Sequence, residues 1–222
     1  MTPHRSFHAS LEKLEADTLE MGRRVRAQVA EAVTALDARD RSRAERVVEG
    51  DRAIDELYLE LHGQWMVLTA TQGPMGSDLR LLASLLHLLV VLERMGDQAS
   101  NIAKMVIATD GLPGDPRLAG LLSAMGEAVL PIADRSLAGF AARDDSAVEE
   151  MKRLDTEVDG FYSDTIDAAV AIGDERSVLE WATRMIMAAR ALERVADQAV
   201  DIAEETRLLV TGERDIYPSG IP

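Results

Sequence analysis

The sequence predicts an all-α protein made of two tandem three-helix bundles. Apolar residues recur every three or four positions along most of the chain, which is the period of an amphipathic helix. Aromatic residues make up only 4% of the 222 residues, whereas strong helix formers are abundant. The second half of the chain also repeats the first. We therefore expect six helices and no strands.

The first three helices are expected at residues 6–38, 41–71 and 77–109. Apolar rows with steps of three and four residues define the first two of them. These rows are Leu11, Leu14, Thr18, Met21 and Val25, and then Ala44, Val47, Asp51, Ile54, Tyr58, Leu61, Trp65 and Leu68. The third helix follows the Gly73-Pro74 break and contains a nearly apolar run from Leu81 to Leu92.

The last three helices are expected at residues 116–142, 146–172 and 176–211. Breaks at residues 111–116, at 143–144 and at Gly173 separate them, because Gly and Pro interrupt helices and Asp or Ser caps their starts. The tail from Gly212 onward is rich in Pro and Gly, so we expect it to be frayed.

Two offsets relate the halves of the chain. An offset of 104 aligns Met21-Gly22 with Met125-Gly126, and an offset of 100 aligns residues 92–103 with 192–203. The second alignment is identical at eight of twelve positions. The difference of four residues falls in the connection before the last helix of each unit, where a length change costs little. The predicted units are residues 1–112 and 113–222.

Charge and composition exclude several classes of function. The chain has 24 Lys and Arg against 39 Asp and Glu, a net charge of −15, which argues against nucleic acid and anionic membranes as partners. The absence of Cys excludes disulfides, zinc–thiolate sites and Cys nucleophiles. Residues 1–20 contain no secretory signal core, and the run from Leu81 to Leu92 is too short to span a membrane. We therefore expect a cytoplasmic protein.

Carboxylates continue the apolar stripes of the expected helices. Glu93, Asp97 and Asn101 are spaced four residues apart and extend a stripe of leucines that begins at Leu82. The second unit has the same row, and further acids interrupt the seam of the second helix in each unit. The complete set is Asp51, Asp55, Glu93, Asp97 and Asn101 in the first unit, and Asp155, Asp159, Glu193, Asp197 and Asp201 in the second.

Acids at such positions repel one another, so protonation, an arginine or a cation must compensate. Arg94 and Arg194 follow the glutamates but point about 100° away on the helix, so each is expected to brace one neighbouring acid. A multivalent cation can neutralise a whole cluster, and oxygen ligands suit magnesium, calcium, manganese or iron. The alternative is a groove of solvated acids, which is the commoner situation for an isolated cluster.

No enzyme signature accompanies these acids. The chain has no Gly-rich phosphate loop, and neither His62 nor His87 lies three residues after a Glu, as di-iron bundle enzymes require. The repeat equivalents of these histidines are Ile166 and Met187. We therefore expect them to be ordinary packed or surface residues.

A Leu-Glu-Arg-x-x-Asp motif occurs at the same place in each unit. It stands in residues 92–103, which follow the Gln-Gly-Pro-Met-Gly-Ser-Asp-Leu-Arg stretch at 72–80, and again in residues 192–203. With these motifs, the chain resembles the PhoU family of phosphate-specific transport accessory and regulatory proteins. Chain length and the expected six helices extend the resemblance over essentially the whole sequence.

The resemblance implies acid motifs that can hold multinuclear clusters of iron, zinc, manganese or magnesium. It also implies a non-enzymatic role, in which the protein helps to keep the phosphate-starvation response off when phosphate is ample. The implied partners are the ATPase subunit of a phosphate ABC transporter and a sensor histidine kinase. We expect a cytoplasmic homodimer that reaches the inner membrane through them. The alternatives are a metal-free helical adaptor and a metal-dependent helical hydrolase.

The sequence departs from the family pattern in three ways. Asp201 replaces the Asn of the first motif, so the second site should be more anionic. Gln98 and Gln198 stand where the family often has His, which removes a nitrogen ligand. The second unit lacks the stretch equivalent to residues 72–76, so a partner contact made by that loop should be one-sided.

Overall fold

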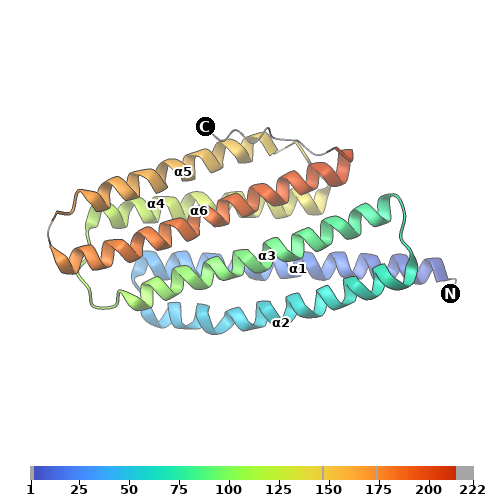
Figure 1. The fold of residues 1–222 in the computed structure, drawn as a ribbon, viewed down its shortest axis with the longest axis horizontal. Helices are drawn as coiled ribbons and strands as arrows, with labels where there is room; N and C mark the ends of the chain where they lie inside the picture. Colours follow the sequence, from blue (N-terminus) through green and yellow to red (C-terminus); the bar gives the residue numbers. More distant parts are fainter. Residues whose placement is uncertain (1–2, 147, 174, 214–222) are drawn as a thin grey trace.

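The computed structural model describes residues 3–146, 148–173 and 175–213 (Figure 1). This part of the chain contains six helices and no strands, which confirms the predicted fold class. The helices are α1 (Pro3–Ala38), α2 (Arg41–Gln72), α3 (Ser77–Ala108), α4 (Pro116–Ala142), α5 (Val148–Val170) and α6 (Arg176–Thr211).

The expected helix ends lie close to the observed ones. The largest differences are in α1, which begins at Pro3 rather than at residue 6, and in α5, which is shorter than the expected 146–172 at both ends. The tail that we expected to fray lies, from residue 214 onward, outside the described residues.

The turns after α1 and α4 repeat the same local chemistry. Arg39 and Arg143 are repeat equivalents, and both adopt left-handed backbone conformations, with φ of 52° and 57°. An aspartate follows each of them. The Asp40 carboxylate accepts a hydrogen bond of 3.0 Å from the backbone N–H of Arg43 and thereby caps α2. The Asp144 carboxylate accepts a backbone hydrogen bond of 3.0 Å two residues further on.

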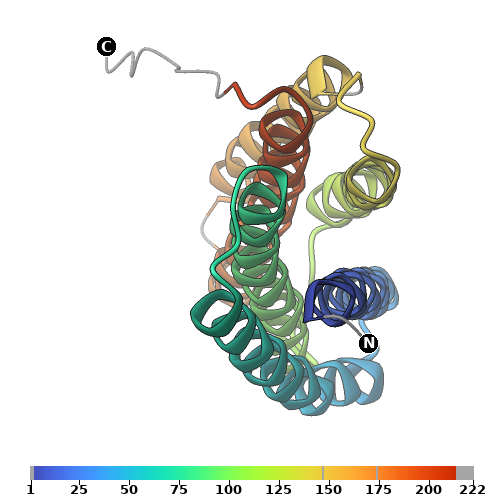
Figure 2. The same ribbon diagram turned by 90° about the vertical axis from the view of Figure 1, so that its right-hand side faces the viewer.

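The helices form two layers. Viewed along the bundle, α2, α3, α6 and α5 form one curved row, and α1 and α4 lie side by side on its concave side (Figure 2). Within each unit the three helices all contact one another, and α3–α6 and α1–α4 contacts join the units. Buried residues from all six helices belong to one hydrophobic core. The two predicted bundles are therefore fused side by side.

Reciprocal glycine contacts join α1 to α4. A Cβ on Gly22 would lie 2.7 Å from Leu137 Cδ2, and a Cβ on Gly126 would lie 2.6 Å from Val33 Cγ1. Gly22 and Gly126 are repeat equivalents, and so are Val33 and Leu137. The two contacts are therefore the same contact made twice, which relates the units by a pseudo-two-fold axis and makes α1 and α4 antiparallel.

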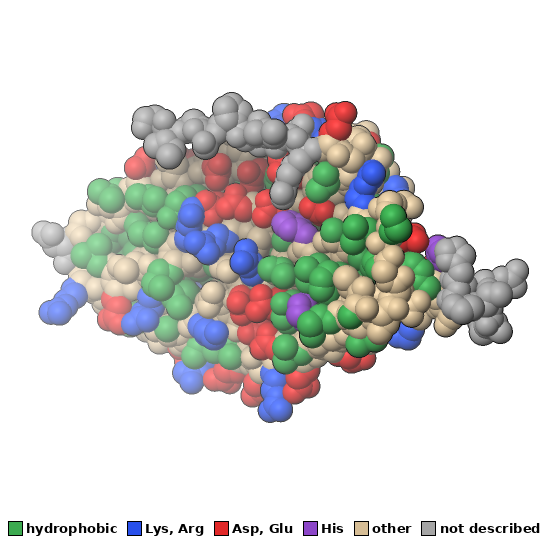
Figure 3. All heavy atoms as spheres, turned by 45° about the vertical axis from the view of Figure 1, so that its right-hand side comes forward, with side chains coloured by type: hydrophobic (Ala, Val, Ile, Leu, Met, Phe, Trp, Pro, Cys, Tyr) green, Lys and Arg blue, Asp and Glu red, His purple; other side chains and the backbone are tan. Residues whose placement is uncertain are grey.

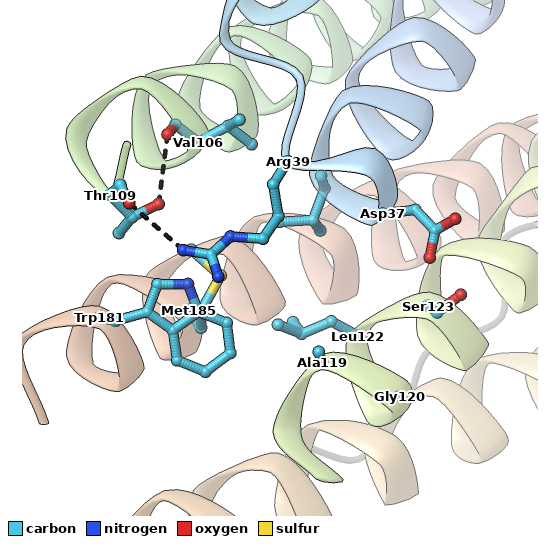
Figure 4. A pocket seen from close by; sticks show the side chains of 11 residues that line it. Asp37, Arg39, Val106, Thr109, Ala119, Gly120, Leu122, Ser123, Trp181 and Met185 are labelled. Atoms are coloured by element: carbon cyan, nitrogen blue, oxygen red, sulfur yellow. Dashed lines mark hydrogen bonds between the residues drawn. The ribbon is translucent and has the colours of Figure 1, made fainter. Parts of the chain in front are cut away.

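The connection between the units closes the end where α3 finishes and α6 begins. The Arg39 guanidinium donates to the carbonyl oxygen of Leu112 at 2.5 Å and lies 5.5 Å from the centre of the Trp181 ring. A Cβ on Gly114 would lie 2.9 Å from the same guanidinium. A largely apolar cavity of about 260 Å³ lies beside this stack (Figure 4). Arg39 therefore ties the segment between the units to both of them.

Replacing Gly126 by alanine is expected to destabilise the fold by about 1–3 kcal/mol. The added Cβ would press on Val33, a β-branched residue with little rotamer freedom in a helix. Urea unfolding followed by circular dichroism measures the change. Gly160→Ala in α5 is the control, since a Cβ there meets nothing within 4 Å and alanine favours a helix by about 0.5–1 kcal/mol. Stabilisation of both variants would contradict the close packing of α1 on α4.

Candidate metal centres

The first acid cluster faces the groove between α2 and α3. Burial raises the pKa of Glu93, and the carboxylates of Asp97, Asp55 and Asp51 raise it further. Burial also raises the pKa of Asp97, with Asp51 and Asp55 acting in the same direction. The structure therefore brings these four predicted residues within electrostatic reach of one another, and Arg94 and Lys104 offset their repulsion only in part.

A side chain from α1, which the sequence analysis missed, completes this cluster. Gln28 Nε2 donates to Asp51 Oδ1 at 3.2 Å and to the Val47 carbonyl oxygen at 3.3 Å. Gln28 Oε1 is buried and accepts no hydrogen bond from the described residues. A Cβ on Gly96 would lie 3.4 Å from Gln28 Oε1 and 3.7 Å from Asp51 Oδ1. An amide oxygen and a carboxylate oxygen therefore both lie close to this glycine.

The sequence held one signal for Gln28. It stands in a row of α1 residues spaced by seven, Leu14, Met21, Gln28 and Ala35, whose other three members are buried. A polar residue in such a row indicates a polar neighbour in the interior.

The second cluster lies between α5 and α6 and is more tightly coupled. Burial raises the pKa of Asp155 to about 6, with Asp197, Asp159, Glu193 and Asp201 acting in the same direction. Burial likewise raises the pKa of Glu193 and of Asp197. Glu193 is only 7% exposed. The other four predicted acids of the second unit therefore all act on Asp155.

Unpaired carboxylate oxygen atoms distinguish the second cluster from the first. Asp155 Oδ1 and Glu193 Oε2 are buried and accept no hydrogen bond from the described part of the chain. The repeat equivalent of Gln28 is Ile132, which has no donor to offer. Asp51 therefore has an amide partner, whereas its counterpart Asp155 has none from that helix.

Arginines act on the clusters in different ways. Arg190 forms an ion pair with Glu193 and lies 5.7 Å from the centre of the Tyr162 ring. Its repeat equivalent is Val90, so this brace exists in the second unit alone. The two arginines that the sequence singled out, Arg94 and Arg194, are exposed, and each lowers the pKa of the glutamate before it.

Asp201 links the second cluster to the first unit. Burial raises its pKa, whereas His87 and Arg94 of α3 lower it. His87 therefore lies within electrostatic reach of an acid of the other unit. Asn101 lines a groove of about 340 Å³ between α3 and α6, together with Gln98, Met105, Met187, Arg190, Ala191 and Arg194.

Acids gather in two groups on one face of the molecule, with Lys and Arg side chains between them (Figure 3). As placed, no three Asp, Glu or His side chains among the described residues converge as the ligands of one ion would. The donors nevertheless fit a hard or borderline cation, because they are carboxylate and amide oxygens. Several of their oxygen atoms are buried without a partner, and nearby cationic side chains offset their mutual repulsion only in part.

Asp155→Asn is expected to raise the free energy of unfolding of the chelator-treated protein by about 1–2 kcal/mol at pH 7.5. The pKa of Asp155 rises from 3.8 to about 6 on folding, so the folded state holds a proton that the unfolded state has lost between these values. The stability that this group contributes is full below pH 3.8 and is lost as the pH rises through 6.

Urea unfolding at several pH values measures this effect as the difference between the variant and the wild type, which should grow from pH 4 to pH 7. Asp164→Asn, at an exposed position of the same helix, is the control and should show no such growth. A pH-independent difference for Asp155→Asn would contradict the described environment of the carboxyl group.

Comparisons with known proteins agree with this architecture. The family model for the PhoU domain matches residues 18–106 and 122–206. A homologue from Xylella fastidiosa is 30% identical over 216 residues, which are 96% of this chain and 89% of the relative. One from Caulobacter vibrioides is 31% identical over 217 residues, 96% of this chain and 94% of the relative. Both are named phosphate-specific transport system accessory protein PhoU homologues.

Two crystal structures have the same fold. PhoU from Pseudomonas aeruginosa superposes with a TM-score of 0.88 at 31% identity and covers 93% of this chain and 100% of its own. The phosphate transport system regulatory protein PhoU from Streptococcus pneumoniae superposes with a TM-score of 0.84 at 26% identity, over 95% and 100%. These names describe accessory and regulatory proteins, in agreement with the predicted non-enzymatic role. The chain belongs to the PhoU family.

Proposed function

We propose that this protein regulates phosphate uptake and phosphate-starvation signalling by linking a phosphate ABC transporter to a sensor histidine kinase. The names of its relatives support the part that concerns phosphate transport. The family resemblance supports the two partners, the ATPase subunit and the kinase, and a role in keeping the starvation response off.

We further propose that both acid clusters bind metal ions, and the observation that carries this proposal is their repetition. In the first site, Asp51, Asp55, Glu93 and Asp97 would hold the ion, with Gln28 and Asn101 as amide ligands. The ligands of the second site would be Asp155, Asp159, Glu193, Asp197 and Asp201. Iron, zinc, manganese and magnesium are the candidate ions, singly or in multinuclear clusters.

A bound cation would supply positive charge where several carboxylates repel one another and Arg190 pairs with Glu193 alone. Because each set of ligands comes from two neighbouring helices, the ion would fix α2 to α3 and α5 to α6. The metal thus has a structural role in this proposal, and Arg94, Arg190 and Arg194 adjust the charge around it.

None of the described helices is long and apolar enough to cross a membrane. We propose a cytoplasmic homodimer that reaches the inner membrane through its partner proteins.

Metal binding is expected to raise the melting temperature, so treatment with a chelator should lower it by about 5–10 °C. Elemental analysis of the natively purified protein should find bound metal. The double variant Asp97→Asn with Asp197→Asn should bind much less of it, because it removes one central carboxylate from each site. Glu49→Gln with Glu157→Gln removes the same charge from exposed positions of α2 and α5 and should bind as the wild type does.

Each outcome selects among the alternatives. Native protein without metal, whose melting temperature does not respond to chelator, would favour the metal-free adaptor. Full metal content in the Asp97→Asn, Asp197→Asn variant would mean that these two aspartates are not metal ligands. Turnover of phosphoester substrates that depends on added metal would favour the hydrolase.

Partner binding is tested with the tagged chain in cells grown on ample phosphate. We expect affinity purification to recover the ATPase subunit and the sensor kinase, because the proposed role requires contact with both. Deletion of the gene should switch on the starvation response in the same medium. Recovery of neither partner, with an unchanged response, would contradict the proposal.

A further inference from the structure

The outer face of α2 changes its chemistry halfway along the helix. The face opposite the core carries charged residues in the first half, namely Glu45, Glu49, Arg52 and Glu56. From Leu59 onward the same face is apolar. Its residues are Leu59, Gly63, Met66, Val67 and Ala70, spaced four, three, one and three residues apart, and we call them the α2 outer stripe.

The side chains of the α2 outer stripe are open to solvent. Leu59 is 67% exposed, Met66 50% and Val67 62%, and a Cβ on Gly63 would meet no atom within 4 Å. Met75, in the loop that follows α2, is 81% exposed. The other side of the helix packs normally, with Ile54 and Leu61 buried. Contiguous exposed apolar side chains of this kind mark interaction surfaces.

The fold itself does not require this stripe. The repeat equivalents of Leu59 and Gly63 in α5 are Ser163 and Asp167, and the equivalent of Met66 is Val170. The helix in the second unit therefore packs on the equivalent neighbours with Ser163 and Asp167 in place of Leu59 and Gly63, and it ends at Val170. The continuous apolar stripe of α2 therefore has no full counterpart in α5, and the fold alone does not account for it.

Charge around the stripe selects its partner. Between residues 53 and 76 the charged side chains are Asp55, Glu56 and Glu60, and there is no Lys or Arg. Lys13 of α1 lies within electrostatic reach of Glu60 but is itself paired with Asp17, so acids remain in excess beside the stripe. A second copy of the chain, itself at −15, would bring like charges together at this surface, and an anionic lipid surface would be repelled. A partner with Lys or Arg beside an apolar seam would be attracted.

We propose that the α2 outer stripe binds an amphipathic helix of a partner protein, through an apolar seam flanked by basic residues. The stripe spans eleven residue steps, about 16 Å of helix, which matches an apolar seam of three turns. Methionine suits such a surface, because its unbranched side chain adapts to the shape of a partner. This site is separate from both acid clusters and does not depend on metal binding.

The test uses two synthetic helical peptides of about 20 residues with the same leucine seam, flanked in one by Lys and in the other by Glu. Each carries a fluorophore, and its anisotropy reports binding to the full-length protein. We expect the Lys peptide to bind at least about tenfold more tightly than the Glu peptide. The double variant Met66→Glu with Val67→Glu should weaken binding of the Lys peptide at least about tenfold.

Val170→Glu, at the 78% exposed repeat equivalent of Met66, is the matched control and should bind as the wild type does. If the double variant loses its helical circular dichroism signal, the milder pair Met66→Gln with Val67→Thr replaces it. Equal binding of the two peptides, or equal loss in Val170→Glu, would overturn the proposal.

Two further outcomes would identify a different occupant and also overturn the proposal. In one, the wild type is a dimer by light scattering and the double variant is a monomer, so that a second copy covers the stripe. In the other, the wild type binds phosphatidylglycerol vesicles and the double variant does not, so that the stripe contacts lipid. Unchanged oligomeric state and no vesicle binding are the expected results.

Discussion

The rest of the structure depends on the close antiparallel packing of equivalent helices across the pseudo-two-fold axis. α1 meets α4 at two glycines, Gly22 and Gly126, where an added Cβ would press on Leu137 and on Val33 of the facing helix. α3 meets α6 along nearly their whole length, and a buried hydrogen bond of 2.6 Å from Ser84 Oγ to Glu205 Oε1 crosses this contact. Because α3 and α6 each pack on three other helices, carboxylates that continue their apolar stripes emerge in the grooves that face α2 and α5. The position of both acid clusters follows from this packing.

The same symmetry makes the differences between the clusters informative. Equivalent helices place Asp51 and Asp155 alike, but Gln28 supplies an amide to the first, and Ile132 supplies nothing to the second. The second unit adds Arg190, which pairs with Glu193, and Asp201, which replaces an amide by a carboxylate. Residues 111–222 accordingly carry a net charge of −11, against −4 for residues 1–110. The second cluster is therefore the more anionic and the more strained electrostatically, and a cation would stabilise it more than the first.

The sequence was sufficient for the helices, because a row such as Ala44, Val47, Ile54 and Leu61 specifies which face is buried without reference to any other part of the chain. The sequence was also sufficient to predict that the acids gather in two groups, because each acid interrupts or continues an apolar row of its helix. It could not supply Gln28, which acts on Asp51 from a different helix, nor the electrostatic effect of His87 on Asp201 of the other unit. These pairs depend on how helices cross, and the repeat did not indicate the second pair, because the equivalent of His87 is Met187. Nor could the pattern of a single helix predict that the two bundles pack into one core.

Several residues that face other helices agree between the units, whereas two positions on the outer face of α2 differ from their equivalents in α5. Gly22 and Gly126, Asp51 and Asp155, and Tyr58 and Tyr162 are matched pairs, but Leu59 corresponds to Ser163 and Gly63 to Asp167. Packing constrains the first group, because a change there opens a cavity or leaves a charge unpaired. Nothing in the fold constrains the second group, so the outer faces are free to acquire separate roles. A protein with two similar halves and one apolar outer face can bind a partner in one orientation only, which a symmetric pair of identical faces could not achieve.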